Sequence, residues 1–189
     1  NTLVFEVHDA IRNLPGATAA RELLLRRGME YLDKLNAEAP TGNLLRTELA
    51  GAYQRLGSAF QTLGDFRASV DARKKALAIR ESLAAAQPDN VEAKINLADA
   101  YITVTTATSY KYGQGAEKRV YAQKAMEIAE QASKLRPADS RVRRTLAWTY
   151  DLMSGSFYID SDYRSAIKWG DKAFVITKEL AEAGAASSV

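Results

Sequence analysis

Apolar residues recur along this chain at helical spacing, in pairs of segments that are separated by short turns. The clearest pair lies between Leu49 and Leu77, where two such segments flank Gly64-Asp65. Apolar stripes with a period near 3.6 residues predict amphipathic helices, and a single tight turn between two of them predicts a helical hairpin. The hairpin at 49–77 is the best-defined element of the pattern.

The landmarks of this hairpin return with a period of 48 or 49 residues, which is typical of a repeat architecture. Four repeats are predicted within one domain over 1–189, with units of about 1–40, 41–88, 89–137 and 138–185. The recurring positions are a large aromatic residue (Phe5, Tyr53, Tyr101, Tyr150), a turn residue (Gly16, Gly64, Gly113, Ser161), a small residue (Gly28, Ala76, Ala125, Ala173) and a terminator (Pro40, Pro88, Pro137, Ala185).

Each landmark has a physical role in a helical hairpin. A glycine after the first helix can adopt the left-handed conformation that closes it, and a proline after the second helix prevents continuation. The first unit is expected to be truncated, and one extra residue before Gly113 predicts a bulge near 105–113. The pattern predicts eight helices, over 2–13, 18–38, 43–63, 66–87, 90–111, 116–135, 140–158 and 163–183.

The second unit resembles a tetratricopeptide repeat in the order of its residues: Tyr53, Leu56-Gly57, Phe60, Gly64, Phe66 and Ala76. The later units match in part, since Met153-Ser154 replaces Leu-Gly in the fourth. These repeats exceed the usual 34 residues by about 14, or two insertions near two helical turns each. The resemblance implies an all-α fold in which four antiparallel hairpins with long helices stack into a right-handed superhelix.

The segment from Phe5 to Leu35 is also similar to the carboxy-terminal repeat region of large bacterial serine/threonine protein kinases. The matching residues are Phe5, His8, Asp9, Ile11, Leu14, Pro15, Gly16, Ala20, Arg21, Tyr31 and Leu32. This resemblance implies a parent with a kinase domain and a membrane segment before these repeats. The repeat region would then lie outside the cytoplasm, and it would be cytoplasmic if the parent had no such segment.

Composition narrows the range of functions. The chain has 189 residues, no cysteine and a formal net charge of +3, too small to favour nucleic acid as a partner. No apolar run reaches the ~18 residues of a membrane span, so the chain is expected to be soluble without direct membrane insertion. The single histidine, His8, has no partners for a catalytic triad or a zinc site, and Gly113-Gln114-Gly115 lacks the context of a phosphate loop. We expect no enzyme activity, no metal and no cofactor in this fragment.

Candidate binding residues lie on the first helices of the hairpins, whose inner face lines the concave surface of the family. Trp148 and Tyr158 are aromatic residues beside the repeat signature. Gln54, Ile102 and Asp151 directly follow the signature aromatic, where chaperone-tail clamps carry asparagine or lysine, so that mechanism is not supported. A basic group brackets Pro137, and it is either a solvated loop or a receptor for an acidic peptide or phosphate. Its members are Lys134, Arg136, Arg141, Arg143 and Arg144.

The sequence therefore predicts a non-catalytic module whose concave face receives a peptide or partner helix. A self-association or spacer module, which would dimerise or position kinase domains, is an alternative from another class. A small-ligand sensor is a third alternative. The identity of the partner does not follow from the sequence.

Overall fold

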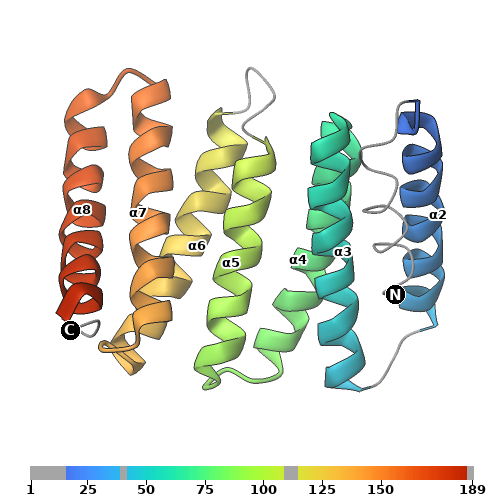
Figure 1. Cartoon of the computed structure of the whole chain (residues 1–189). Coiled ribbons are helices and arrows are strands. Elements are labelled where there is room, and N and C mark those ends of the chain that lie inside the picture. Colours follow the sequence, from blue (N-terminus) through green and yellow to red (C-terminus); the bar gives the residue numbers. More distant parts are fainter. Residues whose placement is uncertain (1–15, 39–41, 109–114, 187–189) are drawn as a thin grey trace. The chain divides into compact units, whose positions relative to one another are not determined.

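The structure is a computed structural model, and it describes residues 16–38, 42–108 and 115–186. Within these ranges the chain forms seven α-helices and no strand (Figure 1). It divides into two compact units, Asn1–Leu83 and Ala84–Val189. The helices are α2 (Thr18–Ala37), α3 (Asn43–Leu63), α4 (Phe66–Ala85), α5 (Val91–Thr108), α6 (Gly115–Leu135), α7 (Ser140–Ile159) and α8 (Tyr163–Ala186).

The all-α fold of antiparallel hairpins is confirmed, because consecutive helices within each unit run in opposite directions (Figure 1). Every described helix begins within one residue of its predicted start, and α3 matches its prediction of 43–63 at both ends. Helix α4 ends at Ala85 rather than at 87, ahead of the bend that leads into Pro88. The predicted helix 2–13 and the bulge-bearing turn around Gly113 lie outside the described residues. The superhelical stacking of all four hairpins stays a prediction.

The turns within the hairpins follow the repeat. Gly64 ends α3 with a φ of 83°, and Ser161 ends α7 with a φ of 62°, so both adopt the left-handed conformation. In each turn the backbone N–H of the residue after the left-handed one donates to a carbonyl five residues earlier, from Asp65 to Phe60 and from Asp162 to Phe157, both at 3.0 Å. This is the hydrogen bond that closes a Schellman motif. A serine therefore performs the role of the turn glycine in the last repeat.

The core of unit 1 is built from the landmark residues of the best-defined hairpin. Tyr53, Leu56 and Phe60 of α3 are fully buried between Leu25 and Leu32 of α2 on one side and the alanines of α4 on the other. Those alanines, Ala72 and Ala76, are almost completely buried, which lets the helices approach closely. The aromatic and Leu-Gly positions of the repeat are therefore packing positions.

The close approach of the paired helices explains the change of Leu-Gly to Met-Ser in the last repeat. A Cβ atom added at Gly57 would lie 2.7 Å from Cγ of Arg73 and 3.2 Å from the carbonyl oxygen of Ser69. In the last hairpin the equivalent positions are exchanged in size, since Ser154 faces Gly170, and its hydroxyl donates to the carbonyl of Ala166 at 2.8 Å. One small residue at the contact is enough, and either helix can supply it.

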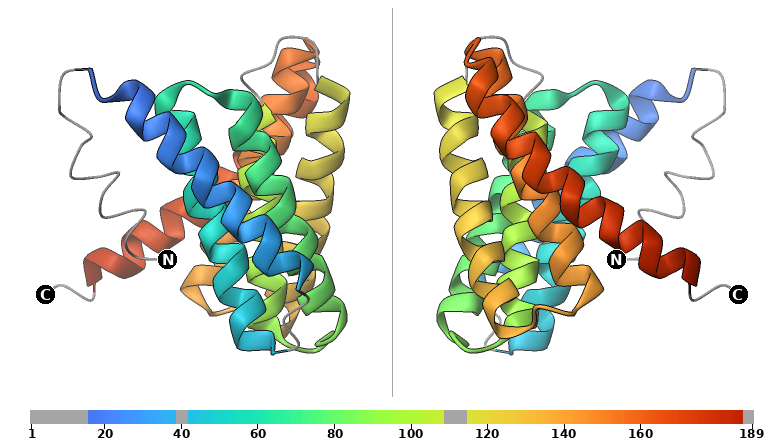
Figure 2. Two further views of the ribbon diagram at one scale, coloured as in Figure 1. Left: turned by 90° about the vertical axis from the view of Figure 1, so that its right-hand side faces the viewer. Right: turned by 90° about the vertical axis from the view of Figure 1, so that its left-hand side faces the viewer.

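Unit 2 contains its own core, formed by α5 to α8. Val91 and Ile95 of α5 pack with Ala132 of α6 and Val142 of α7. One helical turn further along α7, Leu146 packs against Ala98 and Ala129. Figure 2 shows α8 crossing α7 obliquely, so that its carboxyl-terminal half diverges from the other helices of unit 2. One side of α8 therefore remains exposed.

The repeat tyrosines are held by charged residues that the sequence pattern did not single out. The Tyr53 hydroxyl donates to Asp33 at 2.8 Å, and the Tyr150 hydroxyl donates to Glu130 at 3.0 Å, each carboxylate lying twenty residues upstream. A lysine ammonium lies over each ring, as for Lys75 over Tyr53 and Lys172 over Tyr150. The hydroxyl contacts join the second helix of one repeat to the first helix of the next, whereas the lysine contacts join the two helices of one hairpin.

Candidate functional site

Two adjoining grooves on unit 2 share the side chains of Trp148 and Arg144. We call them the α5–α7 groove and the α7–α8 groove, after the helices that line them. The first is lined by Asp99, Ile102, Thr103, Arg141, Arg144, Thr145 and Trp148, and the second by Arg144, Ala147, Trp148, Asp151, Gly170, Ala173, Phe174 and Thr177. Both lie among the later repeats, where the sequence placed the binding surface.

The α5–α7 groove has a volume of about 370 Å³ and joins the first helices of two successive repeats. Its floor is formed by Ile102, of which only 1% is exposed. Trp148 forms a wall and is 52% exposed, an unusual degree of exposure for a tryptophan. An apolar floor beside an exposed aromatic residue offers an anchor pocket for an apolar side chain.

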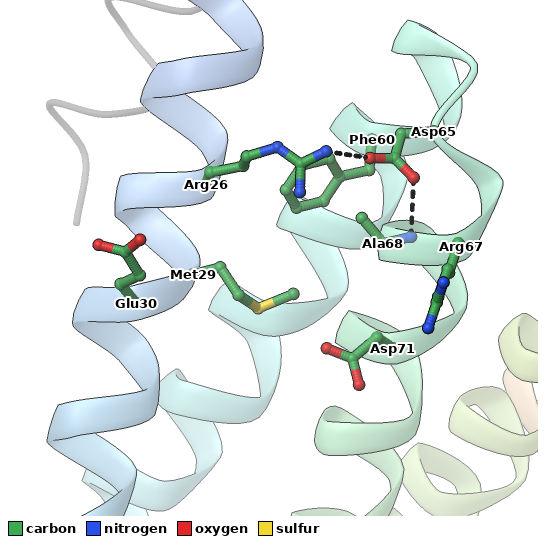
Figure 3. A pocket seen from close by; sticks show the side chains of 8 residues that line it. All are labelled: Arg26, Met29, Glu30, Phe60, Asp65, Arg67, Ala68 and Asp71. Carbon is green, nitrogen blue, oxygen red and sulfur yellow. Dashed lines mark hydrogen bonds and ion pairs between the residues drawn. The ribbon is translucent and has the colours of Figure 1, made fainter.

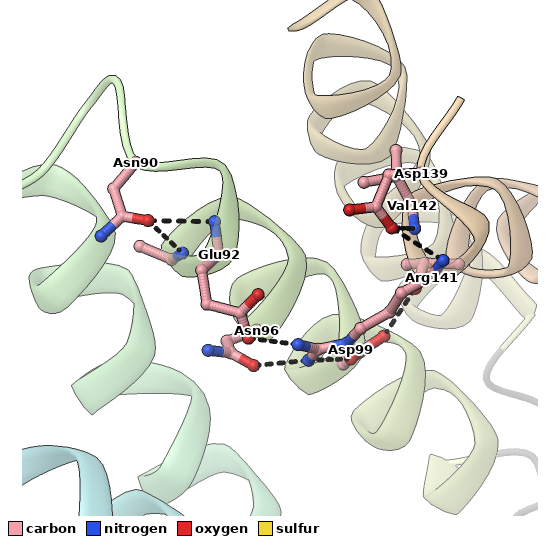
Figure 4. A network of polar contacts seen from close by, with 9 residues as sticks. Asn90, Glu92, Asn96, Asp99, Asp139, Arg141 and Val142 are labelled. Carbon is pink, nitrogen blue, oxygen red and sulfur yellow. Dashed lines mark hydrogen bonds and ion pairs between the residues drawn. The ribbon is translucent and has the colours of Figure 1, made fainter. Parts of the chain in front are cut away.

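A polar network fixes the separation of α5 and α7 at one end of this groove (Figure 4). The guanidinium of Arg141 donates to Glu92, to Asn96 at 2.8 Å and to Asp99 at 3.4 Å. Asn90 and Asp139 cap the two helices, since the side chain of each accepts hydrogen bonds from two backbone N–H groups of the first turn. The network links the starts of two helices that lie one repeat apart.

The carboxyl group of Asp99 is the perturbed acid of this network. Burial raises the pKa of Asp99 above its ordinary value, and the charge of Arg141 and the hydrogen bond from Thr145 oppose that rise. The positive charge of Arg141 therefore counteracts the effect of burial on this carboxyl group. Each oxygen of the Asp99 carboxylate accepts a hydrogen bond from α7, one from Arg141 and one from Thr145, so Asp99 helps to hold α5 against α7.

The α7–α8 groove is larger, with a volume of about 540 Å³. Phe174 on α8 is 66% exposed and stands with Trp148 at its rim, whereas Ala147, Gly170 and Ala173 leave room between the helices. Asp151 lines the groove as well, and its charge acts on Lys118 of α6, whose pKa is lowered by burial and raised by this carboxylate. The groove is mainly apolar, with Arg144 and Asp151 as its charged lining residues.

The structure brings three of the predicted concave-face residues together and leaves two apart. Ile102, Trp148 and Asp151 line one or the other groove. Ile102 is accessible only as a floor because it is almost fully buried. Tyr158 is 65% exposed at the far end of α7, where its ring meets Tyr163 edge-on at 5.6 Å, and it lines neither groove. Gln54 belongs to α3 in unit 1.

Two arginines of the basic group around Pro137 are engaged by acidic residues of the chain itself. Arg141 bonds to α5, and Arg143 pairs with Glu179 of α8. Arg144 is exposed and lines both grooves, with no hydrogen-bond or ion-pair partner in the part of the chain that the structure describes. Lys134 and Arg136 are exposed and line neither groove. Arg144 is therefore the member of this group that is placed to meet a partner.

Unit 1 has a hollow of about 620 Å³ between α2, α3 and α4, lined by Arg26, Met29, Glu30, Phe60, Asp65, Arg67, Ala68 and Asp71 (Figure 3). Its charged residues are largely satisfied by one another or by close neighbours. Arg26 pairs with Asp65 at 3.0 Å, Glu30 pairs with Arg27, and Asp71 pairs with Lys75. None of the predicted site residues lines this hollow.

Among the described residues, no group of three histidine, cysteine, aspartate or glutamate side chains could hold a metal ion. None of the described helices is long and apolar enough to cross a membrane. His8 and the turn at Gly113-Gln114 lie outside the described residues.

Phe174 and Asp99 are site residues that sequence reasoning missed. Both carried a signal, since Phe174 directly follows the small-residue landmark Ala173, and Asp99 lies inside the LADAY copy of the repeat signature. The repeat period could therefore have identified both residues as neighbours of landmark positions. Their exposure and pairing depend on which neighbouring helix covers each position, which the period does not reveal.

No family model matches the chain, and no curated protein sequence matches it. The solved structures that match include a MamA RS-1 ArsTM double mutant, which is 16% identical to this chain. The match covers 94% of each chain, with a TM-score of 0.31. A score this low carries no conclusion about fold or function, so the all-α repeat fold rests on the helices themselves.

Proposed function

We propose that this chain is a non-catalytic protein-interaction module that binds its partner through the two grooves around Trp148. The single observation that carries the proposal is the pair of adjoining apolar grooves that share Trp148 and Arg144. Aromatic residues and arginine are the side chains that most often dominate binding energy at protein interfaces. Both are exposed here on paired helices, which gives a rigid surface.

The test is capture of a partner on the immobilised chain, followed by measurement of its affinity once it is identified by mass spectrometry. Trp148→Ala should lower the affinity at least tenfold, whereas Tyr31→Ala removes an equally exposed aromatic residue of unit 1 and should leave it unchanged. A tenfold change corresponds to about 1.4 kcal/mol, more than the roughly 1 kcal/mol that only a minority of interface residues contribute. Equal affinity in the parent and Trp148→Ala would remove Trp148 from the site.

A finer proposal follows from the sequence resemblance alone. The chain is proposed to be the carboxy-terminal repeat region of a bacterial serine/threonine protein kinase, with the tetratricopeptide-like hairpins as its interaction surface. The nucleotide sequence upstream of Asn1 tests this directly. An upstream reading frame without a kinase domain would contradict the proposal without affecting the grooves.

Self-association is the second candidate, and the exposed apolar residues of α8 favour it. Ile167, Phe174 and Val175 are each more than half exposed on this helix. Apolar patches of this kind often mark contact surfaces between protein molecules. Sedimentation over a range of concentrations should then reveal a dimer, and a monomer at all concentrations would exclude this candidate.

A further inference from the structure

The repeat gives every position in α5 and α6 a counterpart in α7 and α8. Tyr101 corresponds to Tyr150, 49 residues later, and Ala125 corresponds to Ala173, 48 residues later. The surface between α5 and α6 can therefore be compared, residue by residue, with the surface between α7 and α8. The two surfaces are built from corresponding positions, but they differ in whether another helix covers them.

Between α5 and α6, this surface is covered by α7. Ala98 and Ala129 are completely buried against Leu146 of α7, and Ile95 and Ala132 are buried against Val142. The residues of α7 that fill this slot are thus apolar and lie at positions i and i+4. Helix α7 runs antiparallel to α6 (Figure 1), and their buried contacts pair Ala132 with Val142 and Ala129 with Leu146.

Between α7 and α8, the counterpart residues line the α7–α8 groove. In the repeat, Ala147 corresponds to Ala98, Phe174 corresponds to Met126, and Thr177 corresponds to Ala129. Thr177 and Phe174 are exposed, whereas Ala129 is completely buried. The groove is therefore the counterpart of a slot that holds a helix elsewhere in the same unit.

We propose that the α7–α8 groove binds an amphipathic helix of a partner protein, with apolar residues at i and i+4 and an acidic residue in its first turn. This inference rests on the proposed interaction function and names the class of partner for one of its two grooves. The bound helix runs antiparallel to α8, as α7 runs antiparallel to α6. Its apolar residues contact Trp148, Phe174 and the small residues between them.

The acidic first turn is inferred from a reversal of charge between the two slots. Arg141 of the incoming helix α7 is received by Glu92, Asn96 and Asp99. Their counterparts in α7, 49 residues later, are Arg141, Thr145 and Trp148, so no acidic residue is kept at these positions, and Trp148 is the one of the three that lines the α7–α8 groove. Arg144 stands in the groove without a partner among the described residues, and its counterpart Ile95 is buried. A carboxylate would satisfy this arginine by a bidentate contact.

The acidic lining residue Asp151 does not remove this preference. Asp151 lies seven residues, or about two helical turns, after Arg144 on α7. Its charge acts on Lys118 of α6. The basic and acidic ends of the groove are therefore separated along the axis of the bound helix. This arrangement sets the direction of that helix as well as its charge.

The probes are two fluorescein-labelled peptides that copy residues 139–159, the segment that covers the surface between α5 and α6. One is unchanged, and the other carries glutamate at the positions of Arg141, Arg143 and Arg144. Fluorescence anisotropy with the full chain should show the acidic peptide binding at least tenfold more tightly than the basic one. Equal affinities, or a preference for the basic peptide, would overturn the proposal.

Charge reversal in the protein provides the matched control. Arg144→Glu should reverse the preference between the two peptides, whereas Arg136→Glu makes the same charge change outside both grooves and should preserve it. Phe174→Ala should weaken the acidic peptide at least fivefold. Circular dichroism checks that each variant is folded, and if Phe174→Ala is not, the Arg144→Glu comparison still decides. An unchanged preference in Arg144→Glu would overturn the proposal.

Two further outcomes separate this inference from the function on which it rests. If Trp148-dependent binding of an identified partner persists in Phe174→Ala, the interaction function stands and the helix slot is wrong. If sedimentation shows a dimer that Phe174→Glu dissociates, the occupant is a second copy of this chain, and the proposal of a partner helix is overturned.

Discussion

At the scale of single residues, the hydroxyl of Tyr150 is held by a carboxylate from the preceding hairpin, and the same contact recurs at Tyr53 in the other unit. Burial, the hydrogen bond from the Tyr150 hydroxyl to Glu130 and the charge of that carboxylate raise the pKa of Tyr150 to about 12. The same causes raise the pKa of Tyr53. These tyrosines thus contribute a titratable contact between successive repeats.

This contact predicts a loss of stability at high pH. The folded-state pKa of Tyr150 lies above the unfolded value of about 10, so the folded state holds the proton more tightly. The contribution is complete below pH 10 and is lost as the pH rises towards 12. Tyr150→Phe should lower the free energy of unfolding by about 0.5–1.5 kcal/mol at pH 7 and flatten its decline between pH 10 and 12.

Urea unfolding at a series of pH values measures both effects. Tyr163→Phe, at an exposed position, controls for the removal of a phenol. Parallel declines for the parent and Tyr150→Phe above pH 10 would show that Glu130 does not bind the hydroxyl in the folded protein.

Residue-level function was the part of the molecule least open to prediction from the sequence. The basic group around Pro137 was recognisable as a cluster, but its members differ in what they contact. Arg141 meets Glu92, 49 residues away, and Arg143 meets Glu179 on α8, whereas Arg144 lines the grooves. Such long-range pairing depends on the register of neighbouring helices, which a list of charges along one helix does not contain.

At the scale of elements, two of the hairpins have a glycine at the contact between their helices. Gly57 faces Arg73 in one hairpin, and Ser154 faces Gly170 in the other. The helix boundaries could be predicted from period and turn residues, because these features act locally. The sequence did not predict that the small residue at this contact moves from the first helix to the second. The two positions are sixteen residues apart, and whether they meet depends on the geometry of the hairpin.

This exchange predicts coupling between Gly57 and Arg73. Gly57→Ser should cost about 1–3 kcal/mol, because its Cβ would lie too close to Arg73 and to the carbonyl of Ser69. Arg73→Gly should also destabilise, since it removes the hydrogen bond to Gln61 at 2.6 Å. The double variant should recreate the arrangement at Ser154 and Gly170, so its loss should be smaller than the sum of the two by about 0.5–3 kcal/mol.

Chemical denaturation of the parent, the two single variants and the double variant completes the cycle. Thr62→Ala, at an exposed position of α3 where the hydroxyl donates to the Ser58 carbonyl of the same helix at 3.1 Å, controls for substitutions on α3 away from the glycine contact. Strict additivity of the two changes would contradict the proposed contact.

At the scale of the whole molecule, each unit has a core built from contacts between neighbouring helices. The core of unit 1 includes Leu25, Tyr53 and Ala76, and that of unit 2 includes Ile95 and Leu146. In repeat proteins, stability is approximately a sum of repeat terms and nearest-neighbour terms. A change in one core should therefore act locally.

Ala76→Leu tests this expectation, because Ala76 is almost completely buried and a larger side chain must displace its neighbours. Overpacking of this kind costs about 1–3 kcal/mol, which corresponds to roughly a 5- to 150-fold loss of amide protection. Hydrogen exchange should show that loss in α3 and α4, with α7 and α8 unchanged. Ala78→Leu, two residues further along α4 at an exposed position, should have little effect. An equal loss of protection in all helices would show that the chain unfolds as one cooperative body, and the local account of its stability would be wrong.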